Sequence, residues 1–562
     1  MRNFTCFGKK LHLCRLCSSV SCIKTACLSR SFPGLIRCLY HFLFFNVNPL
    51  WIQFFYFVSN SLMGFLVLKI LKPRPDAVRP KDFDVFFTSV SAATVSSMST
   101  VEMEVFSIAQ LVVLTVLMLL GGEVFLSMLG LQIESSKFMK KQEKIENKVD
   151  SLVSSDYLIT SSIHTNVDNQ IELGLVKVPH FEREKPSSVE TCRNIGTDDD
   201  DQLMSCSEDL KYDSIRYLSY VVLGYLLVVH VSGFALVSSY LSLVPSARNV
   251  LENKSISIHT FSVFAIVSTF TNCGFIPTNE NMIVFRKNAG LLLLLIPQVL
   301  LGNTLFPSCL RFVIWVLGRF TKKVEFKYIL KNAGEVGYAH LLPSLHSFLL
   351  VVTVFGFILV QFVLFCSMEW NSEGLNGMNP YQKLVGCLFQ TVNSRHAGES
   401  IVDLSLVSPA VLVLFVVMMY LPPYTSFLPI KDEELSPASS SEKKTKSSWG
   451  RLMENLKFSQ LSYLFIFVIL ICISERKKMK EDPLNFTVLN IVIEVISAYG
   501  NVGFTTGYSC KRQLNPDGQC KDTWYGFSGR WSNTGKLILI VVMFFGRLKK
   551  FNMEGGRTWR LQ

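Results

Sequence analysis

The chain has 562 residues, of which 49% are hydrophobic and only 17% are charged, and its mean hydropathy is +0.34. This composition excludes a set of ordinary soluble domains and indicates a polytopic membrane protein. The formal net charge is +12, but Lys and Arg cluster at the ends of apolar segments, where they act as orientation signals rather than as contacts for nucleic acid.

Eight apolar segments define the predicted membrane helices. A helix needs about 20 apolar residues to cross the hydrocarbon core of a bilayer. The segments that approach or reach this length are Pro49–Leu71, Phe106–Leu131, Tyr217–Leu243, Ala289–Leu317, His346–Met368, Pro409–Leu428, Phe458–Ile473 and Gly535–Gly546. The sequence therefore predicts an all-α protein with about eight transmembrane helices.

Hydrophilic segments separate the apolar ones and predict the topology. The segments 1–48, 132–213, 319–337, 429–457 and 550–562 are expected in the cytoplasm, with both termini on that side, because most of them are basic. Lys72–Lys81 and Arg476–Lys480 are also basic and would lie outside, against this rule. The composition of 132–213 and 429–457 is typical of connectors with little fixed structure. The remaining parts of the chain, which contain the apolar segments, are 49–131, 214–318, 338–428 and 458–549.

A nine-residue block recurs once in each of these four parts. The copies are "VSAATVSSM" (90–98), "VSTFTNCGF" (267–275), "TVNSRHAGE" (391–399) and "ISAYGNVGF" (496–504). The eighth residue of each copy is Ser97, Gly274, Gly398 or Gly503. Such spacing indicates four repeats of one structural unit.

Each block follows a moderately apolar stretch that is too short to cross the bilayer. These stretches are Asp84–Ser91, Thr260–Thr269, Gln382–Thr391 and Thr487–Ser497, and their length favours re-entrant helices. Irregular backbone at membrane depth is tolerated where it is buried in protein or lines a water-filled cavity. The pattern predicts four membrane–pore–membrane repeats, with four re-entrant pore helices, around one central cation pore.

Glycine at the eighth position has a mechanical reason. Without a Cβ, it reaches left-handed backbone conformations that turn neighbouring carbonyl groups toward an axis, where they replace the hydration shell of an ion. One such glycine would indicate only a turn, whereas four in register favour an ion selectivity filter at Ser97, Gly274, Gly398 and Gly503. The residues flanking this predicted filter are Ser96, Asn272, Cys273, His396, Ala397, Asn501 and Val502.

The blocks and their surroundings closely resemble the plant HKT transporters of the Trk/Ktr/HKT superfamily. The matching stretches are "SVSAATVSSMSTVEMEVFS", "STFTNCGFIPTNENM", "FQTVNSRHAGESIVDLS", "MMYLPPYT", "VISAYGNVGFTTGYSC" and "GRWSNTGKLILIVVMFFGRLKKF". The resemblance runs from about Trp51 to Arg560 and omits the first fifty residues and the 132–213 insert. It implies four repeats in one chain, cytoplasmic termini, a plasma-membrane route for Na⁺ or K⁺, and a homodimer.

Ser97 carries the prediction of ion preference. In the family that this chain resembles, serine at the first filter position marks a sodium-selective class, and glycine goes with K⁺-permeable or Na⁺/K⁺-coupled members. A serine Cβ and hydroxyl should disfavour the strained backbone, narrow the ring and disturb a carbonyl cage that suits K⁺. If residue 97 does not act alone, the alternative is a Na⁺/K⁺ symporter or a K⁺ transporter of the same architecture.

Carboxylates follow the blocks closely. Glu399 comes directly after Gly398, and Glu102, Glu104 and Glu280 lie just past their blocks. They either form an acidic outer mouth that concentrates cations, or are solvated or paired with a neighbour such as Arg395. The sequence leaves both interpretations open.

Two basic residues lie in or beside the last apolar segment. Lys536 and Arg547 are 11 residues apart, about three helical turns, and therefore share a face. Cations in or beside a span usually face a cavity or a partner, which suggests a role in gating or restraining ion flow. The alternative is snorkelling to the two interfaces, which is favoured for Lys536.

The predicted outer loops contain sites of covalent modification. Asn253 and Asn485 match the N-glycosylation pattern, and Asn253 is the better acceptor because Asn485 abuts a pore helix. Cys510 and Cys520 bracket a turn-rich loop, so a disulfide between them is a hypothesis.

The function predicted from these features is Na⁺ uniport in a channel-like manner, with Na⁺ as the only metal, bound at the filter. No cofactor and no nucleic acid are expected; the partners are a monovalent cation, the bilayer and a second copy of the chain. An integral-membrane enzyme is the alternative from another class, but the sequence lacks G-x-S-x-G, H-E-x-x-H and Walker patterns. Retrieval of Na⁺ from the transpiration stream, and hence salt tolerance, follows from the resemblance alone.

Overall fold

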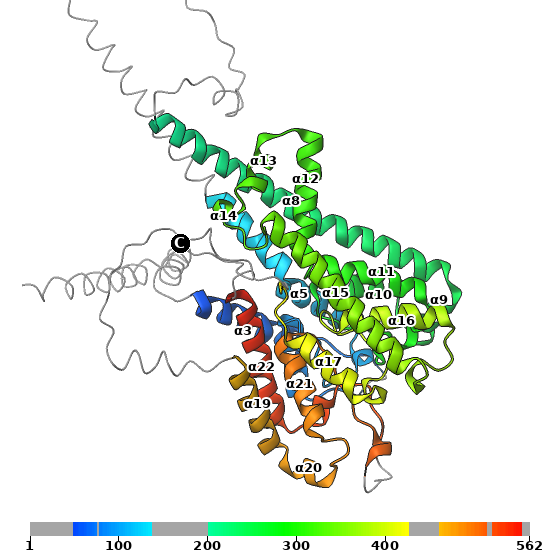
Figure 1. The fold of residues 1–562 in the computed structure, drawn as a ribbon. Coiled ribbons are helices and arrows are strands. Elements are labelled where there is room, and N and C mark those ends of the chain that lie inside the picture. Colours follow the sequence, from blue (N-terminus) through cyan, green and yellow to red (C-terminus); the bar gives the residue numbers. More distant parts are fainter. Residues whose placement is uncertain (1–48, 76–77, 138–199, 426–459, 514–519, 553–562) are drawn as a thin grey trace, which may run out of the picture.

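The computed structural model describes residues 49–75, 78–137, 200–425, 460–513 and 520–552. In these residues the regular structure is helical, apart from an isolated antiparallel pairing of Tyr508 with Thr523 (Figure 1). The predicted all-α fold is thereby confirmed. The predicted segments 1–48, 429–457 and most of 550–562 lie outside the described residues.

Each predicted repeat contains a first helix, a short pore helix and a second helix. By length and composition, three of the described helices could cross a membrane, or five if each of two bent helix pairs is one span. The first helices are α3 (Pro49–Ile70), α8 (Asp200–Leu243), α15 (Ser344–Glu369) and α19 (Gln460–Ser474). The pore helices are α4 (Asp82–Ala93), α10 (Ile258–Thr271), α16 (Pro380–Asn393) and α21 (Val488–Gly500). The second helices are α5 (Ile108–Gly121) with a further helix Glu123–Lys137, α11 (Ala289–Leu301) with α12 (Phe306–Thr321), α17 (Pro409–Tyr420), and α22 (Asn533–Asn552).

Two predicted spans are not continuous helices. Phe106–Leu131 bends by 62° after Gly121, and Ala289–Leu317 bends by 84° after Leu301. The backbone at each break passes too close to the end of α10 for a larger residue. A Cβ added to Gly302 would lie 1.8 Å from the carbonyl oxygen of Phe270, and one added to Gly122 would lie 2.9 Å from Cγ2 of Thr271. The bends therefore make room for a pore helix.

The predicted connectors are more helical than expected. The helix Glu123–Lys137 runs into the 132–213 segment from one side, and α8 begins at Asp200 on the other, while 138–199 lie outside the described residues. In the 319–337 segment, α13 (Val324–Lys331) and α14 (Ala333–Val336) form. The expectation of little fixed structure is wrong at both ends of 132–213, because these ends continue membrane helices.

The pore helices close a ring. Each packs against the first helix of its own repeat and also against the second helix of another: α10 against α5, α16 against α11, α21 against α17, and α4 against α22. Each pore helix therefore contacts the repeat before it in the chain, and the first contacts the last. This pattern brings the four loops that follow the pore helices to a common centre.

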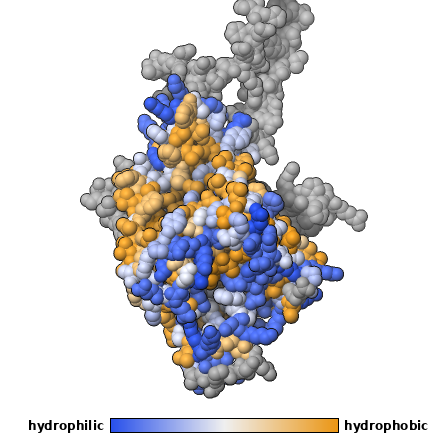
Figure 2. Space-filling view, turned by 90° about the vertical axis from the view of Figure 1, so that its right-hand side faces the viewer, coloured by the Kyte–Doolittle hydropathy of each residue, from blue (hydrophilic) through white to orange (hydrophobic). Residues whose placement is uncertain are grey.

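The outside of the bundle is apolar. Large hydrophobic side chains are exposed on the first helices, among them Leu66, Val231, Phe355, Leu359 and Ile469. Figure 2 views the side on which α9 (Pro245–Asn253) and α16 lie, and shows hydrophilic residues gathered near the centre with hydrophobic residues around them. A hydrocarbon surround and a polar centre explain this distribution.

Candidate functional site

The pore helices end at the centre of the bundle, and irregular backbone follows them. In α10 and α21, the residue after the helix is an asparagine in the left-handed region, Asn272 at φ 58° and Asn501 at φ 48°. Asparagine tolerates this conformation and satisfies the last carbonyl groups of a helix. The negative ends of the helix dipoles then point to the centre, which favours a cation there.

The four predicted filter residues all have a positive φ. Gly274, Gly398 and Gly503 have φ values of +83°, +68° and +99°, and Ser97 has a φ of 52°. Ser97 therefore adopts the backbone conformation that serine is expected to disfavour. For a residue with a Cβ, the left-handed region costs about 1–2 kcal/mol. The surrounding loops must hold Ser97 in this conformation.

These four residues form a closed ring, here called the four-residue ring. A Cβ on Gly274 would lie 1.6 Å from the carbonyl oxygen of Ala397, and one on Gly398 would lie 2.1 Å from that of Val502. A Cβ on Gly503 would lie 2.2 Å from the Cβ of Ser97. The second repeat thus contacts the third, the third contacts the fourth, and the fourth contacts the first. The structure brings together all the positions that the block alignment selected.

Ser97 differs from the glycines because its side chain fills the space between two neighbours. Its Oγ lies 3.4 Å from the Cβ position of Gly274, while its Cβ faces Gly503. The ring therefore has a hydroxyl in one quadrant and bare backbone in the other three.

Side chains beside the ring connect the repeats. Asn501 Nδ2 donates to Ser96 Oγ at 2.8 Å, and Thr304 Oγ1 lies 2.8 Å from His396 Nε2. Of the other flanking residues, Cys273, Ala397 and Val502 are buried and Asn272 is 5% exposed. These contacts lock adjacent loops together.

Glu399 is not part of an acidic mouth. Its side chain is fully buried and accepts a hydrogen bond from Thr269 Oγ1 at 2.5 Å, which ties the third loop to the second pore helix. The proposed neighbour Arg395 instead donates to the carbonyl oxygens of Pro422 and Pro423, at 2.5 and 3.2 Å. The mouth interpretation is wrong for Glu399 because its carboxylate is buried and is not among the described residues lining the cavity over the ring.

Sequence reasoning missed a second buried carboxylate. Glu494 lies in α21, is fully buried, and accepts a hydrogen bond from Thr505 Oγ1. Ser497 Oγ, one turn along the same helix, accepts from the N–H of Gly503 at 3.0 Å. A single charged residue within an apolar helix was the available signal, because such a residue usually has a structural or functional partner.

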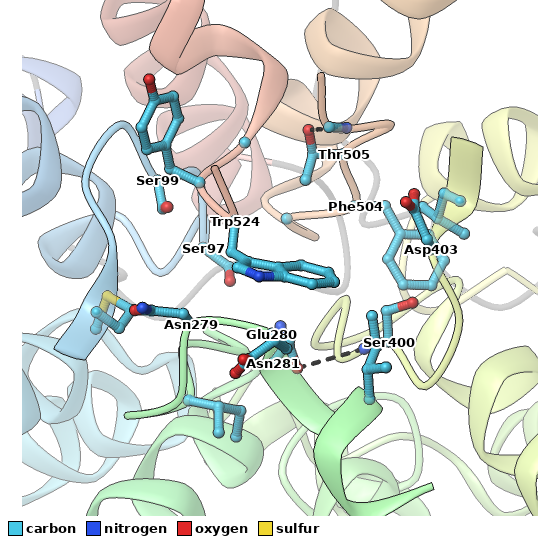
Figure 3. A pocket seen from close by; sticks show the side chains of 18 of the residues that line it. Ser97, Ser99, Asn279, Glu280, Asn281, Ser400, Asp403, Phe504, Thr505 and Trp524 are labelled. Carbon is cyan, nitrogen blue, oxygen red and sulfur yellow. Dashed lines mark hydrogen bonds between the residues drawn. The ribbon is translucent and has the colours of Figure 1, made fainter. Parts of the chain in front are cut away.

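A cavity of about 280 Å³ lies over the ring, and Ser97, Gly398 and Gly503 form part of its wall. We call it the vestibule, and the side of the ring on which it lies the mouth side. Figure 3 shows the indole of Trp524 across this space, with Asn281 and Ser400 nearby. The described residues that line the vestibule include Glu280, Asp403 and Asp522 but no Lys or Arg. Its charge therefore favours cations.

The other predicted mouth carboxylates are partly neutralised. Lys254 Nζ lies 2.5 Å from Glu104 Oε1 and 2.6 Å from Glu280 Oε2, while Glu102 Oε1 accepts the N–H of Trp524 at 3.2 Å. Burial by itself lowers the pKa of Lys254, but hydrogen bonds and charge attraction from both glutamates outweigh it and raise this pKa above 10.5. Of these carboxylates, Glu280 alone is among the described residues lining the vestibule.

The two cations of α22 both contact the first repeat. Lys536 is 5% exposed and its Nζ lies 2.6 Å from Asp84 Oδ1, so the snorkelling interpretation is wrong for this residue. Arg547 is 2% exposed and donates to the carbonyl oxygen of Gly121, at the end of α5. One face of α22 thus joins the fourth repeat to the first.

The predicted modification sites lie on the mouth side. Asn253 is exposed at the end of α9, so its glycosylation stays a prediction. Asn485 is 2% exposed and donates to Asp482 Oδ2 at 2.9 Å, so its side chain is not accessible to a glycosylating enzyme. Cys510 and Cys520 form a disulfide, with Cα atoms 5.9 Å apart.

Comparisons with known proteins identify the relatives of this chain. Residues 200–553 match the TrkH family, described as cation transport protein. The chain is 49% identical to the cation transporter HKT1;3 of Oryza sativa subsp. japonica, over 96% of each chain. It is 51% identical to the sodium transporter HKT1 of Arabidopsis thaliana, over 88% of this chain and 91% of that one. The crystal structure of the potassium transporter TrkH from Vibrio parahaemolyticus aligns with a TM-score of 0.46 at 13% identity, over 95% and 93% of the two chains.

Proposed function

Because the chain belongs to the TrkH family of cation transport proteins, we propose that it carries Na⁺ through the four-residue ring as a channel-like uniporter. The protein is a multi-pass membrane cation transporter and not an enzyme. The proposal goes beyond this family assignment in three respects, which are the ion, its route through the protein and the driving force.

The observation that carries this proposal is the left-handed backbone shared by the four ring positions. We infer that this conformation turns carbonyl groups to the centre, where they would replace the water around a cation. The side chain of Ser97 makes the ring irregular, so a regular cage for dehydrated K⁺ is lost, while the smaller Na⁺, which retains more of its water, still passes. The membrane potential drives the ion, since one charge gains about 2.3 kcal/mol per 100 mV.

The setting of this transport is also part of the proposal. We place the protein in the plasma membrane as a homodimer, with the vestibule facing outward and both termini in the cytoplasm. The basic segments that flank the apolar helices support this orientation. Similarity to the sodium transporter HKT1 supports Na⁺ as the ion, and a role in Na⁺ retrieval from xylem and salt tolerance belongs to the same proposal.

Arg547 is proposed to restrain the flow of ions. It is buried, and its guanidinium lies over the ring of Phe57 at 5.8 Å while it donates to Gly121. A fixed positive charge beside the path, on the side of the ring opposite the vestibule, raises the barrier for a cation.

The test is two-electrode voltage clamp on oocytes that express the full chain. External Na⁺ and K⁺ are exchanged at constant ionic strength, and the reversal potential is recorded. A reversal potential that follows Na⁺ alone supports the uniporter. One that follows K⁺, or both ions in a fixed ratio, favours the K⁺ transporter or the Na⁺/K⁺ symporter, and the absence of any cation current from protein at the cell surface contradicts the proposal.

A further inference from the structure

The vestibule is lined by both acidic and aromatic residues. Its wall includes three acidic residues, Glu280, Asp403 and Asp522, of which Glu280 is paired with Lys254. It also includes five aromatic residues, Phe275, Phe504, Tyr508, Trp524 and Tyr525. Phe275 and Phe504 are 2% and 1% exposed, and Arg530 already lies over the rings of Tyr508 and Tyr525, so Trp524 supplies the open aromatic face. Negative charge attracts any cation, but aromatic faces are not needed for hydrated Na⁺. Aromatic faces together with carboxylates are the chemistry that recognises organic ammonium groups.

Among these residues, Trp524 gives the strongest indication of a ligand site. Its side chain is 51% exposed, and Figure 3 shows its indole lying across the vestibule near Ser97, with Ser400 and Asn281 at its edge. An indole left half in water loses the stabilisation that burial would give it. Its position over the ring presents an aromatic face to whatever occupies the cavity.

The backbone around Trp524 is held in place on both sides. Its own N–H donates to Glu102 at 3.2 Å, and the N–H of Gly526 donates to the carbonyl oxygen of Ser99 at 3.0 Å. The N–H of Phe527 donates to Thr505 Oγ1 at 2.9 Å. These bonds reach the first and the fourth repeat, so the indole is presented by a fixed segment.

The disulfide supports the same segment. Asp522 Oδ1 accepts the N–H of Cys510 at 2.6 Å, next to the Cys510–Cys520 bond. Tyr508 pairs with Thr523 in the isolated antiparallel bridge. The residues immediately before Trp524 are therefore fixed to the chain that follows the fourth block.

From this arrangement we propose that the vestibule is a binding site for a small quaternary ammonium cation, which closes the ion path when bound. The cavity of about 280 Å³ lies at the small end of ligand sites, which span roughly 300–1,000 Å³. Quaternary ammonium has no N–H to satisfy, and its spread charge suits an aromatic face better than a hydrated alkali ion does. An occupant of this space lies directly over Ser97, Gly398 and Gly503.

The first test measures binding without transport. Tetraethylammonium chloride is titrated calorimetrically into the purified full chain. The concentration of the buffer salt is chosen so that the ionic strength stays constant. The expected result is saturable binding that Trp524→Ala weakens about five- to tenfold and Trp524→Phe weakens less than threefold, since phenylalanine keeps an aromatic face. Tyr381→Ala is the matched control, because Tyr381 is an exposed aromatic residue at the start of α16 that does not line the vestibule.

The second test rests on the proposed function. Tetraethylammonium in the bath should reduce the inward Na⁺ current of the wild type, and Trp524→Ala should raise the concentration for half-block by the same factor as in calorimetry. The absence of saturable binding, or binding equally strong in Trp524→Ala, overturns the inference. Saturable, Trp524-dependent binding by a protein that carries no current upholds the binding site and contradicts the proposed function instead. Such binding without any block of a measurable current overturns the statement that the occupant closes the ion path.

Discussion

The buried Lys536 and the partly buried Asp84 form an ion pair, 2.6 Å from Nζ to Oδ1, although 452 residues separate them in the sequence. The pair connects α22, the last helix, to the first turn of α4, the first pore helix. It therefore closes the ring of repeats at the point where the chain itself provides no covalent connection.

Removing one charge of this pair should destabilise the fold. Asp84→Asn leaves the ammonium of Lys536 buried without a counter-charge, which costs about 3–5 kcal/mol. Asp82→Asn is the matched control, because Asp82 pairs with Lys69 at the surface, where the side chains are 58% and 44% exposed, and such pairs contribute about 0–1 kcal/mol. Thermal unfolding of the purified variants measures the difference, and equal losses in both variants would contradict the role of the pair.

Ser97→Gly should change ion preference and leave the fold intact. Glycine reaches the left-handed region without the strain of about 1–2 kcal/mol that a Cβ brings, so thermal stability should stay equal or rise. The ring then loses its hydroxyl, and the ratio of K⁺ to Na⁺ permeability, read from reversal potentials, should increase. Ser99→Gly, in the same cavity wall, is the control. An unchanged ratio in Ser97→Gly would place selectivity elsewhere.

Alanine at Gly274 or Gly398 should abolish the current. Each Cβ would overlap a backbone carbonyl of the next repeat, at 1.6 Å from Ala397 and 2.1 Å from Val502, so the loops must move apart. Gly356→Ala, in the middle of α15 with no atom within 4 Å of the added Cβ, should conduct like the wild type. Currents are normalised to surface expression, and conduction by either ring variant at wild-type level would refute the ring as the ion path.

The Lys254 cluster should give an alkaline loss of stability. Because the folded-state pKa of Lys254 is raised above 10.5, its contribution is fully present below that pH and disappears as pH rises through the raised value. Lys254→Met leaves Glu104 and Glu280 without their cation and should unfold at a lower temperature at pH 8. The gap between variant and wild type should narrow above pH 10.5. A gap that is the same at both pH values would show that packing, rather than charge, holds this cluster.

The sequence by itself determined the class of fold and the positions of the ring. The length of each apolar segment and the clusters of charge at its ends indicate which segments face the bilayer. Both are local properties of the chain. The four blocks in register selected Ser97, Gly274, Gly398 and Gly503 because the same loop must be made four times, so one alignment reveals all four.

Only the tertiary structure decided which side chains meet across the repeats. Glu399 contacts Thr269 and Lys536 contacts Asp84 because the ring closes. These partners are 130 and 452 residues apart, and no local pattern encodes a partner at such a separation. The bends at Gly122 and Gly302 also depend on tertiary contacts, since each bend makes room for the end of α10. The place of Trp524 over the ring likewise depends on hydrogen bonds to the first and fourth repeats, contacts that exist only after the chain has folded.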